Sequence, residues 1–345
     1  MKEEIRAKAL ELGFDQCGFA NSEPPLSARQ FQDWIAAGKQ GEMAYLARNE
    51  EKRIDPQKVL PGAKSVVSLA VSYATAVENY EPPRGFGVVA RYARYRDYHD
   101  TLARLLAELA RWMDQTGPRE TRSLWYVDTG PLLERDLAQR SGIGFVGKHT
   151  NLISRNLGNW FFICEILTTL ELTPDVPGVN RCGSCTRCLQ ACPTGAITAP
   201  FQLDARQCIS YLTIELKGPI PLELRAAIGN RVYGCDDCLA ACPWNRFARQ
   251  GSLMKRHARS DLSTPELCEL LRLDDAGFKL KFAGTPLLRT KRRGLLRNAA
   301  VALGNTGDRC SLPALEKAAA DSEPLIAEHA EWAIGEILKR ARSPR

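Results

Sequence analysis

The chain has 345 residues, of which 44% are hydrophobic and 25% are charged, and its formal net charge is +7. This length accommodates two or three domains, and the composition is that of a soluble globular protein. No apolar run is long enough for a membrane span, and the first residues form a charged amphipathic pattern rather than a signal peptide. We therefore expect a cytoplasmic protein without a membrane partner.

Residues 1–172 are predicted to mix helices and strands. Apolar residues at helical spacing predict helices over the first 60 residues, with Pro24 and Pro25 between the first two. The β-branched run from Ser65 to Tyr73 predicts a buried strand. The other predicted elements are a long amphipathic helix, 98–116, and two strands, 123–127 and 159–170. Because strands alternate with helices, we expect an α/β domain.

Two further domains are expected after this one. Residues 173–250 form a ferredoxin-like insert that is rich in cysteine, and residues 251–345 are predicted to be all helical. The helical part contains an internal repeat with a period of 31 residues, in which Arg297–Gly304 aligns with Glu328–Gly335. Small residues at matching positions suit the close packing of helices in a HEAT-like repeat. An unrelated helical hairpin is the alternative.

Twelve cysteines in such a chain indicate metal ligands rather than disulfides. The run from Cys182 to Pro193 spaces four cysteines by two, two and three residues and ends in Cys-Pro, which is the bacterial ferredoxin pattern for [4Fe–4S] clusters. A second run, from Cys235 to Pro243, repeats the later part of this pattern. Val232 stands where its first cysteine would be, and Cys208 is the expected replacement.

The fourth cysteine of each run in two-cluster ferredoxins binds the other cluster. This crossing rule predicts one cluster on Cys182, Cys185, Cys188 and Cys242, and a second cluster on Cys192, Cys208, Cys235 and Cys238. Zinc is the competing metal, because Cys-x2-Cys pairs also form four-cysteine zinc sites, but the Cys-Pro endings favour iron–sulfur. Buried structural thiols are expected at the remaining positions, Cys17, Cys164, Cys268 and Cys310.

The densest polar stretch of the first domain follows the predicted strand at 123–127. Asp128 stands there before a Gly-Pro turn, which is a common position for a reactive group. The same carboxylate could instead cap the helix that follows, and the pattern leaves both interpretations open. Glycines at 142, 144 and 147 loosely resemble a dinucleotide loop, but they do not directly follow a strand.

Positive charge is concentrated between Arg246 and Arg297, where there are 13 Lys and Arg residues and 5 Asp and Glu residues. A basic surface confined to one segment indicates a polyanionic partner, and each phosphate contact adds salt-dependent affinity. The residues expected to contact phosphates are Lys255, Arg256, Arg289, Lys291, Arg292, Arg293 and Arg297. A solvated basic surface without a partner is the alternative.

Taken together, these motifs resemble those of the epoxyqueuosine reductases. The resemblance covers nearly the whole chain and rests on both cysteine runs and on three further segments, Asp128-Thr-Gly-Pro-Leu-Leu-Glu-Arg135, Gly147-Lys-His-Thr150 and Cys208-Ile-Ser-Tyr-Leu-Thr213. It implies a cobalamin- and iron–sulfur-dependent enzyme, related to reductive dehalogenases, that reduces epoxyqueuosine to queuosine at the wobble position of tRNA. It also implies that Asp128 donates a proton and that Arg135 is a polar partner in the pocket.

The resemblance places cobalamin between the first domain and the clusters, bound base-off without a protein ligand to cobalt. Asp97-Tyr-His99 is loosely similar to a motif that supplies a histidine ligand in other cobalamin enzymes, but Leu102 stands where that motif has glycine. We therefore expect His99 at a helix N-terminus or in the pocket wall. By loop position, the residues expected to contact cobalamin are Arg53, Asp128, Lys148 and Asn151.

The expected division of labour is cobalamin binding and reduction in residues 1–172, two [4Fe–4S] clusters in 173–250, and tRNA binding in 251–345. We expect a monomer whose partners are the anticodon stem-loop of a tRNA carrying epoxyqueuosine and a low-potential electron donor that the sequence does not identify. A ferredoxin-like electron carrier and a reductive dehalogenase of small molecules are the alternative functions. A carrier has no need of the large first domain, and a dehalogenase leaves the basic segment unexplained.

Overall fold

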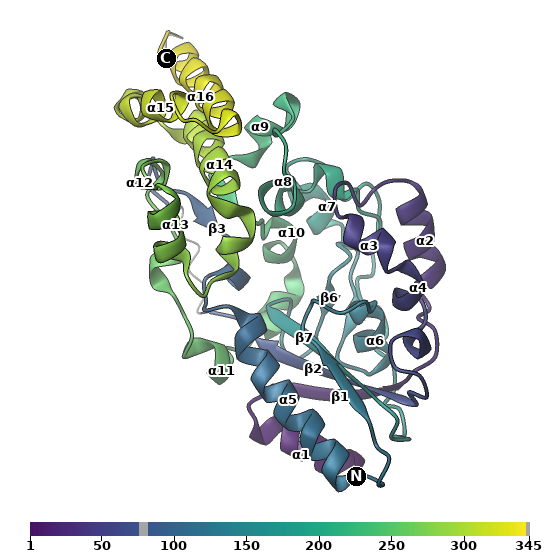
Figure 1. The fold of residues 1–345 in the computed structure, drawn as a ribbon. Helices are drawn as coiled ribbons and strands as arrows, with labels where there is room; N and C mark the ends of the chain where they lie inside the picture. The colour runs from purple at the N-terminus through teal and green to yellow at the C-terminus, as the bar shows by residue number, and fades with distance from the viewer. Residues whose placement is uncertain (76–81, 343–345) are drawn as a thin grey trace.

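The computed structural model describes residues 1–75 and 82–342 (Figure 1). Its N-terminal part is built on a four-stranded sheet in the order β1-β2-β7-β4, in which every neighbouring pair is antiparallel. The strands are β1 (Gln16–Asn21), β2 (Ser65–Ser72), β4 (Ser123–Tyr126) and β7 (Phe161–Thr168). All eight residues of β2 are buried, because helices and loops cover both faces of the central strands.

Two helices cover one face of this sheet, α1 (Lys2–Glu11) and α5 (Tyr98–Thr116). Leu102, Leu106, Leu109 and Met113 follow one another at helical spacing along α5, and all four are fully buried. The other face is covered by α6 (Glu134–Arg140) and by the loop that carries Leu60 and Ala63. The remaining helices of this part are α2 (Ala28–Ala36), α3 (Ala44–Arg48) and α4 (Glu50–Arg53).

The predicted strands at 65–73, 123–127 and 159–170 and the predicted helix at 98–116 are all present. However, the sheet is antiparallel, so the alternation of strands and helices does not generate the parallel sheet of a typical α/β domain. The prediction of helices alone over the first 60 residues is wrong, because β1 lies there. Gly18 explains why this strand has a weak sequence signal: a Cβ at this position would lie 2.0 Å from the Ser141 carbonyl oxygen, so the close approach requires glycine.

The insert is a set of short elements joined to both neighbouring parts. Its β8 (Arg231–Tyr233) pairs in parallel with β3 (Val88–Val89) from the N-terminal part. The helix after the insert, α11 (Ser252–Lys255), returns to the N-terminal core through Leu253 and Met254. Packing therefore crosses the boundaries expected at 172 and 250. The other helices of the insert are α7 (Arg187–Ala191), α8 (Ile209–Ile214), α9 (Leu222–Ile228) and α10 (Asp237–Ala240).

The C-terminal part is helical and lies at the opposite end of the molecule from the N-terminus (Figure 1). Its helices are α12 (Leu267–Leu271), α13 (Asp275–Phe282), α14 (Lys291–Thr306), α15 (Leu312–Ala319) and α16 (Pro324–Arg342). The repeat aligns α14 with α16, and these two helices pack against each other. The matched alanines at 299, 302, 330 and 333 are all fully buried, as expected for the shared face of paired helices.

The shorter elements complete the description. Two short strands form a hairpin beside the first cysteine run, β5 (Phe145–Val146) and β6 (Leu152–Ile153). Single 3-10 turns occur at η1 (Pro56–Lys58), η2 (Arg91–Ala93), η3 (Ala205–Gln207), η4 (Pro243–Phe247), η5 (Ser260–Leu262), η6 (Pro286–Thr290) and η7 (Arg309–Ser311). Among the described helices, none combines the length and apolarity needed to cross a membrane.

Candidate functional site

The candidate site is centred on Asp128, which follows β4 and is exposed. Its backbone is in the left-handed region with φ of 54°, a conformation that costs on the order of 1 kcal/mol for a residue other than glycine. The Tyr98 hydroxyl donates a hydrogen bond to Asp128 Oδ2 at 2.8 Å, and the Asp128 backbone N–H donates to Glu134 Oε1 at 3.0 Å. Tyr98 of α5 therefore fixes the carboxylate, and Glu134 of α6 fixes the backbone that carries it.

These contacts decide between the two interpretations of Asp128. The N-cap residue of α6 is Leu133, and no side chain makes a capping hydrogen bond there. Asp128 directs its carboxylate to Tyr98 instead, so the helix-cap interpretation is wrong. A carboxylate that is exposed but fixed by a phenol suits a role at a ligand site.

Tyr98 is a site residue that sequence reasoning missed. It is the first residue of α5, and its ring stacks between His99, at 4.0 Å, and Phe162, at 4.2 Å. Burial raises the pKa of the Tyr98 phenol, and the charge of Asp128 and the hydrogen bond to it raise this pKa further, so the hydroxyl keeps its proton. The only sequence signals were its place beside His99 and at the start of the predicted helix at 98–116.

Two further carboxyl groups lie near Asp128, the half-buried Glu134 and the fully buried Glu165. Burial raises the pKa of Glu134 to about 8, and the Asp128 charge adds to this, whereas Arg135 and Arg53 oppose it. Burial also raises the pKa of Glu165, on β7, well above its ordinary value, and the charge of Glu134 contributes. Neither carboxyl oxygen of Glu165 has a hydrogen-bond partner within the described chain. Both groups are therefore favoured in the neutral form, which limits the negative charge around Asp128.

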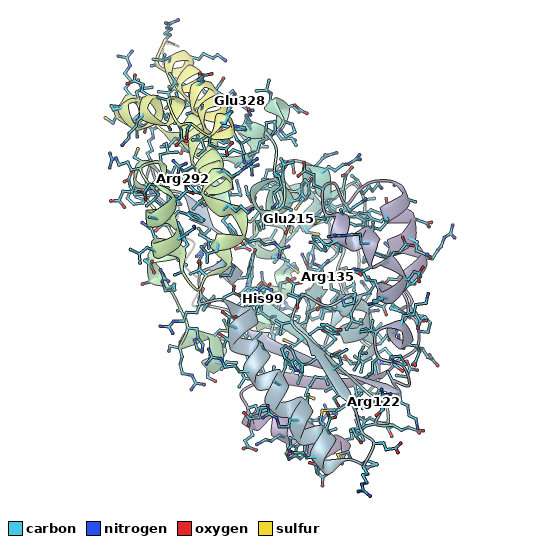
Figure 2. The ribbon with its side chains drawn as sticks, viewed as in Figure 1. His99, Arg122, Arg135, Glu215, Arg292 and Glu328 are labelled. Carbon is cyan, nitrogen blue, oxygen red and sulfur yellow. The ribbon has the colours of Figure 1, made fainter. Side chains whose placement is uncertain are left out.

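One residue of the C-terminal part, Arg289, is close enough to the site for its charge to interact with that of Asp128. Arg289 forms an ion pair with Glu215 at 2.7 Å and lies 6.0 Å from the ring centre of Tyr45. Burial lowers the pKa of Arg289, but the charges of Glu215 and, more weakly, Asp128 leave it raised overall. Figure 2 shows His99, Arg135 and Glu215 near the centre of the molecule, where the three parts meet, and Arg122 at the far end of the sheet.

The other residues expected in the pocket lie in two places. Arg53 is beside Asp128: its Nη1 donates to the Leu132 carbonyl at 3.1 Å, and its Nε is buried without a partner among the described residues. Arg135 is exposed on α6, and its Nη1 donates to the Thr150 carbonyl at 3.3 Å. Lys148 turns toward the first cysteine run, where its ammonium donates to the Gly183 and Cys185 carbonyls at 2.7 and 3.0 Å, respectively.

His99 and His149 are held by their Nδ1 atoms. His99 is the second residue of α5, as expected for a helix N-terminus, and its Nδ1 pairs with Asp97 Oδ1 at 2.7 Å. His149 Nδ1 accepts the backbone N–H of Asn151 at 3.1 Å. Burial lowers the pKa of His149 to about 4, with the Asn159 side chain acting in the opposite direction. In both histidines, Nε2 is buried without a hydrogen-bond partner in the described structure.

Four cysteines line a cavity of about 100 Å³ together with Lys148 and His149. We call these cysteines the first thiol set: Cys182, Cys185, Cys188 and Cys242. Burial raises the pKa of Cys242, and the charges of Cys182 and Cys185 contribute to the increase. In the described chain, no group of three or more His, Cys, Asp or Glu side chains converges on a single metal-ion position. A [4Fe–4S] cluster binds each thiolate through a different iron atom, so thiols around a cavity suit it.

The second thiol set consists of Cys192, Cys208, Cys235 and Cys238. Burial raises the pKa of Cys238, and the charges of Cys235, Cys208 and Cys192 raise it further. Burial also raises the pKa of Cys208, and the charge of Cys192 contributes to the increase. The fold therefore brings the distant Cys208 to the position where the second run lacks a cysteine. All eight cysteines are free thiols.

The four other cysteines do not share one environment. Cys17 and Cys164 are buried, as expected for structural thiols. Cys268 is half-buried and Cys310 is exposed, so the expectation of a buried thiol at Cys310 is wrong. Cys310 lies in η7, a surface turn where Asp308 Oδ1 accepts its backbone N–H.

The basic residues expected to contact phosphates do not form one surface. Arg297 is only 1% exposed, and its guanidinium donates to the carbonyls of Leu212, Leu216 and Gly218, so it is not available to phosphates. Arg292 is mostly buried and bonds Asp321 and the Leu273 carbonyl. The exposed members lie in two regions: Arg289, Lys291 and Arg293 near the start of α14, and Lys255 and Arg256 on the distant α11 (Figure 1).

Comparison with known proteins finds similarity over the whole chain. Residues 181–245 match the family described as a 4Fe-4S double cluster binding domain, and residues 53–129 match that described as epoxyqueuosine reductase QueG, DUF1730. The epoxyqueuosine reductase of Xanthomonas campestris pv. campestris is 42% identical over 340 residues, which cover 96% of this chain and 95% of that protein. The epoxyqueuosine reductase of Escherichia coli K12 is 39% identical over 345 residues, covering 99% and 90%, respectively.

A solved structure is also similar over the full length. The crystal structure of an epoxyqueuosine reductase with an epoxyqueuosine-modified tRNA-Tyr stem loop has a TM-score of 0.89 and 34% sequence identity to this chain. The alignment covers 100% of this chain and 94% of that chain. The similarity thus includes the sheet, the cysteine insert and the C-terminal helices.

The raised pKa of Glu134 predicts how stability changes with pH. The folded chain binds this proton more tightly than the unfolded chain between the ordinary value of 4.5 and about 8. Its contribution to the free energy of unfolding is therefore complete at low pH and is lost as pH rises through about 8. Glu134→Gln removes the titration, so chemical denaturation should show a shallower decline in stability between these pH values.

Between pH 4.5 and about 8, the free energy of unfolding of the unmodified chain should fall by at least about 1 kcal/mol more than that of Glu134→Gln. The upper limit is about 5 kcal/mol, because each pKa unit corresponds to about 1.4 kcal/mol. Glu171→Gln, at an exposed position, is the matched control and should keep the slope of the unmodified chain. Parallel curves for Glu134→Gln and the unmodified chain would show that Glu134 is ionised in the folded state.

Proposed function

This chain belongs to the epoxyqueuosine reductase family, and we propose that it reduces the epoxide of epoxyqueuosine to the alkene of queuosine at the wobble position of tRNA. It is an oxidoreductase with a double [4Fe–4S] cluster domain at residues 181–245. The observation that carries the proposal is that a fixed, exposed Asp128 and two sets of four thiols occur together in a chain similar to these enzymes over its full length. Because tRNA is the substrate, we place the protein in the cytoplasm.

The reaction requires both electrons and protons. Converting an epoxide to an alkene breaks two C–O bonds, forms one C=C bond and releases the oxygen as water, which consumes two electrons and two protons. We propose that Asp128 supplies a proton to the oxygen as the first C–O bond breaks, because an acid at this position prevents an alkoxide from accumulating. The Tyr98 hydroxyl and the Glu134 carboxyl would orient Asp128 through the bonds at 2.8 and 3.0 Å.

The electrostatic surroundings support this role. A general acid must be able to hold a proton, and neighbouring carboxylates that were ionised would add negative charge next to it. The neutral forms of Glu134 and Glu165 reduce this charge. Arg289, opposite Asp128, offers a cation that can balance the carboxylate after proton transfer.

We assign the two clusters to the two thiol sets. The cavity of about 100 Å³ and the four thiols around it fit a cluster in the first thiol set. The second thiol set fits a cluster as well, because the fold brings its four members close enough for their charges to interact: Cys192, Cys208, Cys235 and Cys238. When bound, the clusters would pass electrons one at a time from an external low-potential donor toward the site.

Cobalamin is the proposed partner of the clusters at the site. Two buried polar atoms near Asp128, Arg53 Nε and His99 Nε2, have no hydrogen-bond partner in the described chain. The amide groups around a corrin ring can pair with such atoms, so the residues fit this cofactor. Bound cobalamin would supply a strongly reduced cobalt that acts as nucleophile or reductant. Lys148 is already engaged by two carbonyls, so we leave it out of the proposed contacts; base-off binding stays a prediction.

The proposed tRNA surface lies beside the site at the start of α14. Arg289, Lys291 and Arg293 are exposed there, and Arg289 is close enough to Asp128 for the two charges to interact. Phosphates bound at this edge would hold the wobble nucleotide near Asp128. Lys255 and Arg256 lie on the distant α11, so we leave them outside the proposed interface.

Asp128→Asn tests the acid directly. The amide keeps the size of the side chain and can still accept the Tyr98 hydrogen bond, but it has no proton to give. We expect single-turnover reduction to slow by at least about 100-fold, a typical contribution of a general acid, while iron content and tRNA affinity stay unchanged. Conversion is followed by mass spectrometry of the tRNA nucleosides. Asp33→Asn, at an exposed carboxylate on α2, is the control; full activity in Asp128→Asn would refute the acid role.

Cys208→Ser tests the cluster assignment. Removing the one ligand that comes from outside both cysteine runs should cost the second thiol set its cluster. Iron bound after anaerobic reconstitution should fall from about eight atoms to about four per chain. Cys310→Ser removes an exposed cysteine outside both sets and should retain about eight. A Cys208→Ser protein that keeps both clusters would contradict the assignment.

The double variant Lys291→Gln/Arg293→Gln tests the tRNA surface. Losing two phosphate contacts should weaken binding of an anticodon stem-loop and reduce the slope of log affinity against log salt by about 1 to 2. Fluorescence anisotropy of a labelled stem-loop over a range of KCl concentrations measures both quantities. The control, Lys255→Gln/Arg256→Gln, removes the same charge from α11 and should bind as the unmodified chain does. If only the control variant loses affinity, the interface lies on α11 instead.

A further inference from the structure

His149 carries a buried proton donor whose orientation is set by the backbone. The residue lies between β5 and β6 and is 2% exposed. The Asn151 N–H donates to its Nδ1 at 3.1 Å, so Nδ1 has a lone pair and no proton. The ring therefore carries its proton on Nε2. Nε2–H is a donor in this structure.

This donor is unsatisfied within the protein. His149 Nε2 has no hydrogen-bond partner in the described part of the chain, and an unmet buried donor costs about 1–3 kcal/mol. The loop fits closely around the ring: a Cβ on Gly147 would lie 3.2 Å from Nε2 and 2.5 Å from Ile153 Cδ1. The loop thus leaves no room for a side chain at position 147.

The acceptor side is the cavity of the first thiol set. His149 lines this cavity together with Cys182, Cys185, Cys188 and Cys242. Asn159 is close to both His149 and Cys242, since it acts on the pKa of each, and its Oδ1 also lacks a partner in the described structure. Asn159 Oδ1 is therefore the competing acceptor. The Asn159 amide is oriented by its Nδ2, which donates to Asn245 Oδ1 at 2.9 Å and leaves Oδ1 able to accept.

We propose that His149 Nε2 donates a hydrogen bond to a sulfur of the cluster in the first thiol set and so raises the reduction potential of that cluster. Adding an electron makes the cluster more negative, and an N–H donor stabilises the more negative state, which makes the cluster easier to reduce. The inference rests on the proposed function only in requiring this cluster. His149 acts through the cluster and is a positioning residue, not a catalytic one.

Replacing His149 should change the reduction potential of one cluster and leave that of the other cluster unchanged. His149→Phe keeps a planar ring without a donor, and His149→Gln restores an N–H group on a flexible side chain. In redox titrations of the reconstituted full chain, followed by EPR without tRNA or cobalamin, one of the two midpoint potentials should become more negative in His149→Phe. The other should not move, and His149→Gln should lie closer to the unmodified chain. His257→Phe, at a half-buried histidine that does not line the cavity of the first thiol set, is the control.

A second measurement uses the unmodified chain, so it does not depend on a variant that folds. The chain contains four histidines, and selective 15N-histidine labelling introduces few nuclei. Pulsed EPR of the reduced clusters should detect one coupled histidine nitrogen. Absence of this coupling, or unmoved potentials in a His149→Phe protein with full iron content, would overturn the inference and leave Asn159 as the acceptor. Failure of the unmodified chain to assemble two clusters would instead refute the proposed function.

Discussion

The hydrogen bond from Tyr98 to Asp128 is the interaction on which the proposed site depends. It joins the first residue of α5 to the loop after β4, while Glu134 at the start of α6 accepts the Asp128 backbone N–H. The left-handed backbone of Asp128 persists because these two contacts offset its cost. The result is a carboxylate that is exposed to a substrate yet fixed in direction, which is what proton delivery to a defined oxygen requires.

The other parts of the chain are placed around this contact by buried polar groups. Arg297 donates from α14 to three carbonyls at the end of α8, and the adjacent Asn298 donates to the Thr213 and Val232 carbonyls. These bonds satisfy a buried guanidinium and amide, and breaking them would leave unpaired polar groups in the core. They anchor the helical part on the cysteine insert and so help to position Arg289, whose charge interacts with that of Asp128. In the proposed tRNA interface, Arg297 would act only by holding the surface that carries Arg289 and Lys291.

Sequence reasoning identified the features that depend on local spacing. The helix at 98–116 and the buried strand at 65–73 follow from nearby residues and are present. The proposed cysteine sets and the proposed role of Asp128 rest on motif order. The features it missed depend on contacts between distant segments. The strand β1 exists because β2 pairs with it, the neutral form of Glu165 depends on its burial on β7 beside Glu134, and Arg297 is buried only because α14 packs on the insert. A charge count treats Arg297 and Lys291 alike, whereas the fold buries one and exposes the other.

The central claim is that the fixed Asp128, the two thiol sets and a bound cobalamin together reduce epoxyqueuosine in tRNA. It is tested most directly by incubating the anaerobically reconstituted chain, loaded with cobalamin, with epoxyqueuosine-containing tRNA and a strong low-potential reductant, and then measuring both nucleosides by mass spectrometry. The account predicts that epoxyqueuosine disappears and an equal amount of queuosine forms, and that omitting cobalamin abolishes the conversion. Unchanged epoxyqueuosine in the presence of both clusters and bound cobalamin would contradict it.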